Sequence, residues 1–199
     1  VVVGGGYTGV ELAAELADLS GRRALRVGLL EAGPSLLPQS AAWLGKAAAA
    51  SLERLGVQVL LDSPCLAVDR RGLQVAGGHI RADLVVWATG VRAPGLLGDA
   101  GLQVNAAGRA LVDGTLAAVG HPEVLVVGDA AAATDWRGGE LPPSAQIAVQ
   151  QAAHVAAALL GRPAREFVPR LAGEALSLGA RGGLARVGPL ALEDAPAVL

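Results

Sequence analysis

The sequence of 199 residues has little of the chemistry that cysteine, methionine and aromatic side chains provide. It contains no methionine, one cysteine, three tryptophans, one tyrosine and one phenylalanine. The lone Cys65 cannot close a disulfide within the chain, and no cysteines and histidines recur at the spacing of a metal site. We therefore expect neither a redox-active cysteine pair nor a bound metal in these residues, and we interpret Cys65 as a buried, inert thiol.

The sequence also has no large excess of charge of one sign and no long apolar run. Sixteen Lys and Arg residues face 18 Asp and Glu residues, a net charge of −2. The basic residues are scattered rather than clustered with aromatic ones, so we expect no nucleic-acid partner. No apolar run approaches the roughly 20 residues that cross a bilayer, so we expect no transmembrane helix and no signal peptide. Because the chain opens inside a predicted strand and has no methionine, we expect it to be part of a longer protein.

The first third of the chain alternates strands with helices. The 52% of hydrophobic residues suffice for a core, and their period switches between that of a strand and that of a helix. The pattern predicts, in order, a strand at 1–5, a helix at 8–19, a strand ending at Glu31, a helix at 41–55 and a strand at 57–63. Such βαβ units have right-handed crossovers and build a parallel, doubly wound sheet. The fold class is therefore α/β, with a Rossmann-like first domain.

The period changes after Pro64. Three short alternating segments, 65–70, 72–78 and 79–90, predict an antiparallel meander that covers one face of the nucleotide domain. From Val91 the composition turns to Gly, Ala and Pro, with a buried strand predicted in "VLVVGD" at 124–129 and a helix at 144–160. The segment after that helix predicts hairpin strands.

Three glycines of the opening "VVVGGGYTGVELAAEL" have the spacing of a dinucleotide-binding turn. Gly4 allows the tight turn, Gly6 lets a pyrophosphate approach the backbone, and Gly9 permits close packing of helix on strand. The N–H groups at the start of the helix, including those of Tyr7 and Thr8, hold the phosphates together with the helix dipole. Glu31 ends the second strand, where a carboxylate binds the ribose hydroxyls and repels a 2′-phosphate. This arrangement favours NADH over NADPH.

Glu11 lies in the first turns of the same helix, and two interpretations stay open for it. A carboxylate there is stabilised by the helix dipole alone. It can also face the nicotinamide end of the cofactor and assist catalysis.

Two later motifs, "DLVVWATG" and "EVLVVGDAAA", follow buried strands in this order after the glycine turn. Together they resemble the flavoprotein reductases with two dinucleotide-binding domains, the pyridine nucleotide-disulfide oxidoreductase superfamily. The resemblance implies that Gly128 and Asp129 bind FAD, with the Asp129 carboxylate accepting hydrogen bonds from the ribitol. It also implies that Ala88, Thr89 and Gly90 mark the crossover from the NAD domain to the FAD domain.

The segment "LPPSAQIAVQQAAHVAAAL" resembles type II NADH:quinone oxidoreductases within that superfamily. Gln146 and Gln150 are i,i+4 on one helix, so their amides share a face and can bind a quinone carbonyl. The resemblance places the start of this helix, Ala145, Gln146 and Ile147, at the flavin, where its positive end stabilises an anionic reduced ring. The alternative is an Ala-rich packing helix whose glutamines lie in solvent.

The resemblance thus implies an FAD-dependent NADH dehydrogenase that passes hydride from NADH to flavin and electrons to a quinone. It divides the chain into an NAD(H)-binding domain at 1–87, the C-terminal part of an FAD domain at 88–163, and the start of a β-hairpin or interface region at 164–199. The first half of the FAD domain is not in this chain. We expect a cytoplasmic protein that attaches peripherally to the membrane, and a homodimer is compatible with the sequence. A ferredoxin- or rubredoxin-type reductase and a non-catalytic NAD(H) sensor remain alternatives.

Overall fold

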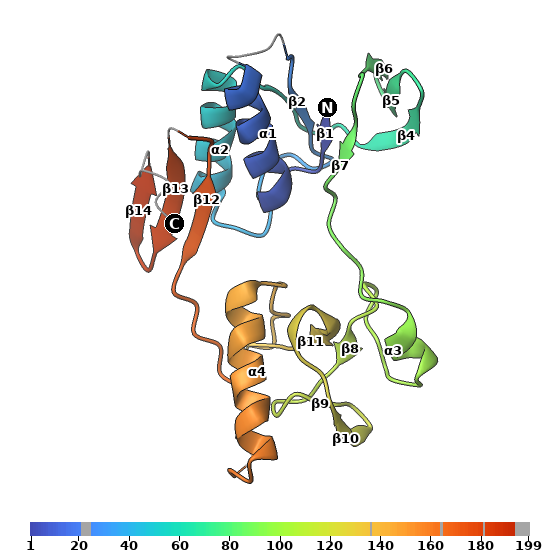
Figure 1. The fold of residues 1–199 in the computed structure, drawn as a ribbon, viewed down its shortest axis with the longest axis vertical. Coiled ribbons are helices and arrows are strands. Elements are labelled where there is room, and N and C mark those ends of the chain that lie inside the picture. Colours follow the sequence, from blue (N-terminus) through green and yellow to red (C-terminus); the bar gives the residue numbers. More distant parts are fainter. Residues whose placement is uncertain (21–24, 136, 164, 181, 194–199) are drawn as a thin grey trace. The chain divides into compact units, whose positions relative to one another are not determined.

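The computed structural model of the chain describes residues 1–20, 25–135, 137–163, 165–180 and 182–193 (Figure 1). The chain forms two compact units, one made of Val1–Gly90 with Ala172–Leu199 and the other of Val91–Leu171. These divisions lie a few residues beyond the boundaries predicted after residues 87 and 163. The C-terminal segment, predicted as a region of its own, folds with the first unit.

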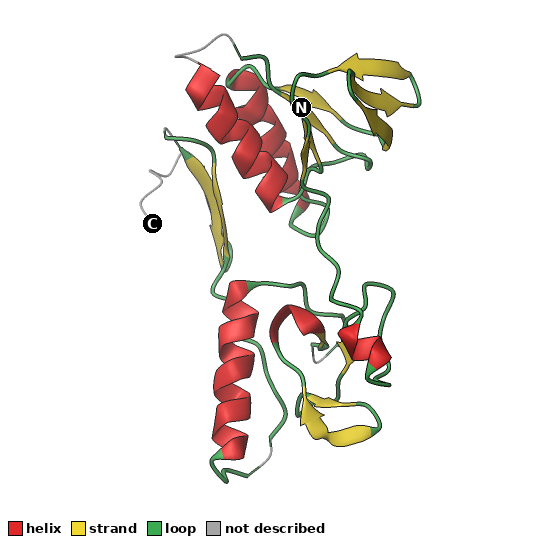
Figure 2. Ribbon diagram, turned by 45° about the vertical axis from the view of Figure 1, so that its right-hand side comes forward, coloured by secondary structure: helices red, strands yellow, loops and turns green. Residues whose placement is uncertain are grey.

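A parallel sheet forms the centre of the first unit, as the alternation of elements predicts. Its strand order is β3-β2-β1-β7, and every neighbouring pair is parallel. The strands are β1 (Val2–Val3), β2 (Gly28–Leu30), β3 (Gln58–Leu60) and β7 (Val86–Trp87). Helices α1 (Tyr7–Ser20) and α2 (Ala42–Arg54) connect them, and Figure 2 shows the two helices side by side.

Successive strand residues point to opposite faces of this sheet, and each face has its own core. Val2 and Leu29 belong to the larger core, together with the apolar face of both helices. Val3 and Leu30 pack instead against Leu73 on the opposite side. Leu73 comes from the predicted meander, which therefore covers one face of the sheet.

The antiparallel meander comprises β4 (Cys65–Asp69), β5 (Gly72–Val75) and β6 (Gly78–Arg81). The third segment predicted for it, 79–90, belongs to the meander only as far as Arg81. Its second half returns to the parallel sheet, where Val86 N–H donates to the Val1 carbonyl at 2.9 Å and Ala88 N–H to the Val3 carbonyl at 2.8 Å. An uninterrupted apolar run suits a strand of a parallel sheet better than an alternating meander strand. Cys65, predicted to be buried, is only partly so because it starts the edge strand β4.

The C-terminal segment forms a three-stranded antiparallel sheet rather than a single hairpin. Its strands are β12 (Glu174–Ser177), β13 (Gly183–Val187) and β14 (Leu190–Glu193). Leu176, Leu178 and Leu184 from this sheet are buried in the same core as α1 and α2. Apolar burial thus joins the last part of the chain to the helix that follows the glycine turn.

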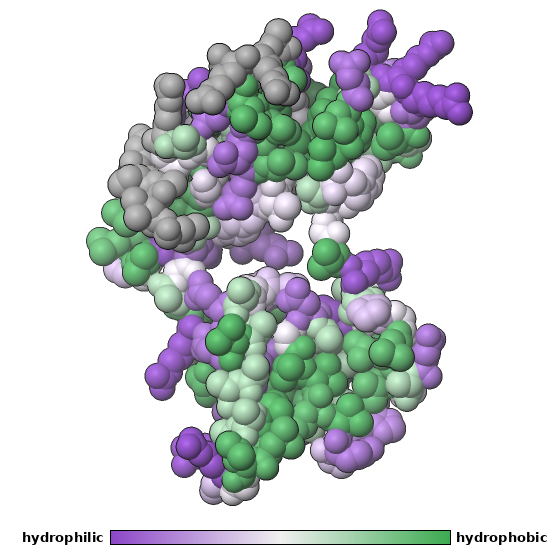
Figure 3. All heavy atoms as spheres, in the orientation of Figure 1, coloured by the Kyte–Doolittle hydropathy of each residue, from purple (hydrophilic) through white to green (hydrophobic). Residues whose placement is uncertain are grey.

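The second unit is built from short elements around two small cores. They are α3 (Leu96–Asp99), β8 (Ala110–Leu111), β9 (Ala117–Ala118), β10 (His121–Leu125), the 3-10 turn η1 (Gly128–Ala130), β11 (Ala131–Ala132) and α4 (Ala145–Leu159). The strand predicted in "VLVVGD" ends earlier, at Leu125, because the chain bends into η1 there. Helix α4 agrees with its prediction and keeps apolar residues exposed, Val149, Leu159 and Leu160 among them; Figure 3 shows apolar residues along this unit.

Candidate functional site

The glycine turn between β1 and α1 depends on three glycines in two different ways. A Cβ on Gly4, whose φ is +111°, would overlap the Ala88 carbonyl, and a Cβ on Gly9 would overlap the Gly4 carbonyl. A Cβ on Gly6 would meet nothing within 4 Å. Gly4 and Gly9 are therefore needed for packing within the protein, whereas Gly6 leaves open space in front of the turn.

Backbone donors face that open space without partners. Val10 N–H donates to the Gly6 carbonyl at 3.0 Å, which begins the helical bonding of α1. The four preceding N–H groups, those of Gly6, Tyr7, Thr8 and Gly9, have no acceptor among the described residues. Unpaired N–H groups at the positive end of a helix form an anion site, and a pyrophosphate supplies the acceptors they lack.

Glu31 lies directly beside the turn, and both of its carboxylate oxygens are held by the backbone. Oε2 accepts from Gly5 N–H at 2.7 Å and Oε1 from Gly33 N–H at 2.8 Å. Each oxygen keeps a further lone pair for a ligand hydroxyl. A Cβ on the buried Gly5 would lie 2.6 Å from the Leu36 side chain and 2.9 Å from Glu31 Cβ. The roles of Gly5 and Gly33 were missed, although the run of three glycines and the sequence Glu-Ala-Gly carry the signal.

Two side chains on the first turns of α1 contact the C-terminal sheet. Glu11 Oε1 accepts from Ser177 N–H at 3.0 Å. Tyr7 donates its hydroxyl to Glu174 Oε2 at 2.8 Å and lies 2.9 Å from the Ser40 hydroxyl. Glu11 therefore has a packing role in the structure, and its assistance at the nicotinamide stays a prediction.

Burial and charge perturb the two ionisable groups of this contact in opposite directions. Burial raises the pKa of Tyr7, and the negative charge of Glu174 adds to the effect. Burial alone would also raise the pKa of Glu174. Hydrogen bonds from Arg186 and Tyr7 outweigh that effect, so the pKa of Glu174 lies below its ordinary value.

In the second unit, the Gly128–Asp129 turn also combines an exposed polar side chain with a hydrogen-bonded backbone. Gly128 has a φ of +67°, and its N–H donates to Gln151 Oε1 at 2.6 Å. Asp129 is exposed, and no described residue pairs with its carboxylate. Gln151 is 1% exposed and was missed by the sequence reasoning; an amide inside an Ala-rich apolar run is the signal that was available.

The start of α4 is capped, and its glutamines have unequal surroundings. Ser144 Oγ accepts from Ile147 N–H at 3.3 Å; Ile147 is buried, whereas Ala145 and Gln146 are exposed. The Gln150 amide donates to the Gln146 and Arg170 carbonyls at 3.0 and 2.9 Å and accepts from Arg170 N–H at 2.9 Å. A quinone bound by Gln150 would have to replace the contact with Arg170.

The comparison with known sequences agrees with this geometry. Residues 1–152 match the family described as pyridine nucleotide-disulphide oxidoreductase. The chain belongs to this family. A type II NADH:quinone oxidoreductase of Mycobacterium tuberculosis is 36% identical over an alignment of 178 residues, which covers 79% of this chain and 37% of that protein. The chain therefore spans well under half the length of this curated relative.

Solved structures show that the oxidoreductase fold extends over nearly the whole chain. NDH2 of Plasmodium falciparum in complex with NADH has a TM-score of 0.82 and covers 98% of this chain and 58% of its own, with 18% identity. An FAD-dependent pyridine nucleotide-disulphide oxidoreductase of Desulfovibrio vulgaris has a TM-score of 0.74 and covers 92% of this chain and 47% of its own, with 22% identity. At these identities the likeness establishes the fold. Within the described residues, no helix has the length and apolar character needed to span a membrane.

The three residues predicted to mark the crossover between the domains, Ala88, Thr89 and Gly90, end the first segment of the first unit. The Ala88 backbone packs beneath Gly4, while Thr89 and Gly90 are exposed and Gly90 has a φ of +104°. Ala88 therefore supports the glycine turn directly, a contribution separate from the predicted one toward FAD.

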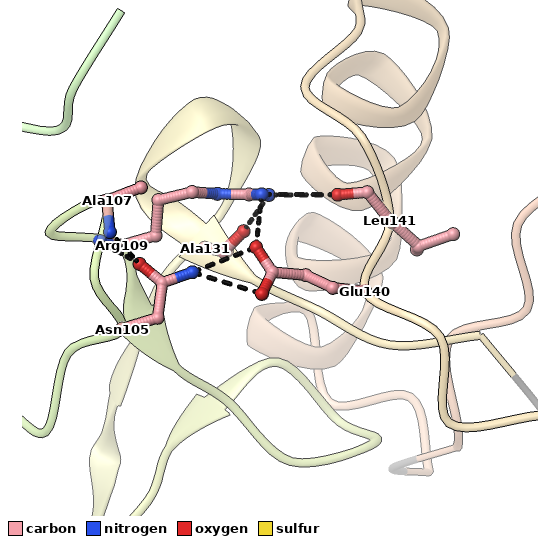
Figure 4. A network of polar contacts seen from close by, with 6 residues as sticks. All are labelled: Asn105, Ala107, Arg109, Ala131, Glu140 and Leu141. Carbon is pink, nitrogen blue, oxygen red and sulfur yellow. Dashed lines mark hydrogen bonds and ion pairs between the residues drawn. The ribbon is translucent and has the colours of Figure 1, made fainter. Parts of the chain in front are cut away.

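A buried arginine stabilises the second unit of the chain next to the Gly128–Asp129 turn (Figure 4). Arg109 donates to the Ala131 carbonyl at 2.5 Å, to the Leu141 carbonyl at 3.2 Å and to Glu140 Oε1 at 2.6 Å. Asn105 completes the network by donating to the Glu140 carboxylate at 2.9 Å. Because Ala131 directly follows η1, this network fixes the exit from the turn.

Proposed function

We propose that this chain supplies the NADH-binding domain and part of the FAD-binding domain of an NADH:acceptor oxidoreductase. The proposal is carried by the N–H groups of Gly6, Tyr7, Thr8 and Gly9, which have no acceptor among the described residues and lie beside the fixed Glu31 carboxylate. A pyrophosphate next to a ribose diol is the ligand whose acceptors and hydroxyls match these groups.

Glu31 favours NADH over NADPH for an electrostatic reason. Its carboxylate is held by two backbone donors, and no cationic side chain among the described residues pairs with it. A ribose 2′-hydroxyl can donate to it, whereas a 2′-phosphate would place further negative charge beside it.

The second unit supplies groups suited to FAD. The unpaired Asp129 carboxylate can accept hydrogen bonds from ribitol hydroxyls, and Gln151 holds the Gly128 backbone that precedes it. Ala145, Gln146 and Ile147 at the start of α4, together with Ala88, Thr89 and Gly90, are the remaining residues assigned to this cofactor. Bound FAD would accept hydride from NADH and deliver electrons to the acceptor.

A quinone is the acceptor class we favour, because the relative from Mycobacterium tuberculosis is named for that activity. Gln146 and Gln150 are the residues of this chain assigned to it, and such an acceptor would place the reaction at a membrane surface. Gln150 would have to give up its contacts with Arg170 to bind a quinone directly.

An anaerobic titration of the full-length protein with NADH, and separately with NADPH, tests the proposal through bleaching of the oxidised flavin band. Bleaching by NADH, with much weaker bleaching by NADPH, is the expected result. Glu31→Gln should raise the Kd for NADH about 10- to 100-fold, since a hydrogen bond to a charged group contributes about 1.5–3 kcal/mol. Glu15→Gln, the same change at an exposed position farther along α1, is the matched control. Failure of the protein to bind flavin would overturn the proposed function.

A further inference from the structure

Two hydrogen bonds connect the C-terminal sheet to the first turns of α1, although the bonded residues are more than 160 positions apart in the sequence. Tyr7 and Glu11, one helical turn apart on α1, contact β12 at Glu174 and Ser177 respectively. The sequence separations of these two contacts are 167 and 166 residues. Both contacts lie within the first compact unit, although the chain between them forms the second unit.

Tyr7 belongs to the glycine turn and also contacts the C-terminal sheet. Its N–H is one of the four unpaired donors of the turn, and its side chain is held at the hydroxyl. A phenol has one proton, which Tyr7 donates to Glu174, so the Ser40 hydroxyl is the donor in the second bond. The backbone N–H of Tyr7 is thus available to a ligand, while its side chain is bonded to the C-terminal sheet.

Glu174 is in turn fixed from the other side. Its Oε1 accepts from Arg186 Nη2 at 2.5 Å, and the two residues are directly opposite each other in the pairing of β12 with β13. The side chains of Arg186 and Glu174 are 40% and 26% exposed. One carboxylate therefore joins a cross-strand ion pair to the tyrosine of the turn.

We propose that Glu174 is a positioning residue of the NADH site, which acts through Tyr7 to orient the first turn of α1. The inference rests on the proposed function, since it takes the turn to be the pyrophosphate site. It adds that the site is completed by the C-terminal sheet rather than by the βαβ unit alone. Holding the donors in place before the ligand arrives lowers the entropy cost of binding.

The test measures NAD⁺ affinity by calorimetry in the full-length protein, because NAD⁺ shares the pyrophosphate and does not reduce the flavin. Tyr7→Phe and Glu174→Ala should each raise the Kd for NAD⁺ about three- to tenfold, the range of a single hydrogen bond. The double variant should bind no more weakly than either single variant, because both remove the same connection. Glu174→Gln keeps an acceptor for Tyr7 and should recover most of the affinity.

Glu193→Ala is the matched control, an exposed glutamate on β14 of the same sheet. It should leave the Kd unchanged, and the flavin content should be the same in all variants. An unchanged Kd in Tyr7→Phe, which preserves most of the packing, would overturn the inference even if Glu174→Ala failed to fold. Additive effects in the double variant would overturn it as well. Absence of NAD⁺ binding by the unaltered protein would instead overturn the proposed function.

Discussion

Replacing Arg109 by methionine should loosen the second unit around the Gly128–Asp129 turn. The guanidinium donates to the carbonyls of Ala131 and Leu141, residues that are 0% and 5% exposed. A buried carbonyl left without a donor costs about 1–3 kcal/mol. Two such groups, partly offset by the apolar packing of methionine, give an expected loss of about 2–4 kcal/mol in local stability. Glu140 adds less than about 1 kcal/mol, because its side chain is 45% exposed and water can replace the arginine.

Hydrogen exchange of the β8 and β11 amides in the full-length protein measures this loss without requiring two-state unfolding of the whole molecule. A loss of 2–4 kcal/mol corresponds to exchange that is about 30- to 700-fold faster, with tenfold per 1.4 kcal/mol. Arg92→Met is the control, because exposed Arg92 also donates to a backbone carbonyl, that of Ala106, at 2.7 Å. Exchange in Arg109→Met that matched the control would refute the reasoning, since the buried carbonyls would then need no charged donor.

Three further predictions follow from single contacts. Gly6→Ala should leave the fold intact and abolish NADH binding, measured by calorimetry, whereas Gly9→Ala should reduce folded yield because its Cβ overlaps the Gly4 carbonyl. Gln151→Leu leaves Gly128 N–H without its acceptor and should lower the flavin content of the purified protein; an unchanged content would remove this amide from the support of the turn. The lowered pKa of Glu174 means that its contribution to stability is present above its ordinary value of 4.5 and is lost as the pH falls through the lower folded value. Glu174→Gln should therefore flatten the acid limb of the melting-temperature profile.

The glycine turn and the parallel sheet were predictable because both leave a local pattern in the sequence. Gly9 meets the Gly4 carbonyl, as the spacing of the motif implies, and buried strands alternate with amphipathic helices. The contact of Gly4 with the Ala88 carbonyl is distant in sequence and was not predicted. The return of 86–87 to the sheet was not predicted. The uninterrupted apolar run favours a parallel strand, but its partner β1 lies more than 80 residues away, and the local pattern does not contain that pairing.

The polar contacts of the site were the least predictable part. Gln151 is buried and Gln150 only partly so, although they are adjacent glutamines in an Ala-rich helix. The direction of a glutamine side chain is decided by the segments that pack on the helix, here η1 for Gln151 and Arg170 for Gln150. In the same way Glu11 follows the motif glycines as predicted, yet its partner comes from β12.

Three separate parts of the chain hold the glycine turn in place, which favours the binding of a ligand to its N–H groups. The Ala88 carbonyl lies beneath Gly4, Glu31 accepts from Gly5 N–H, and Glu174 accepts from the Tyr7 hydroxyl. Each contact fixes a different residue of the turn, so the unpaired N–H groups keep one arrangement without a ligand present. The ordering entropy is then lost during folding rather than during binding. A substitution at Glu174 should therefore weaken NADH binding although this side chain does not touch the ligand. Its effect should add to that of a substitution at Glu31, because the two act on different residues.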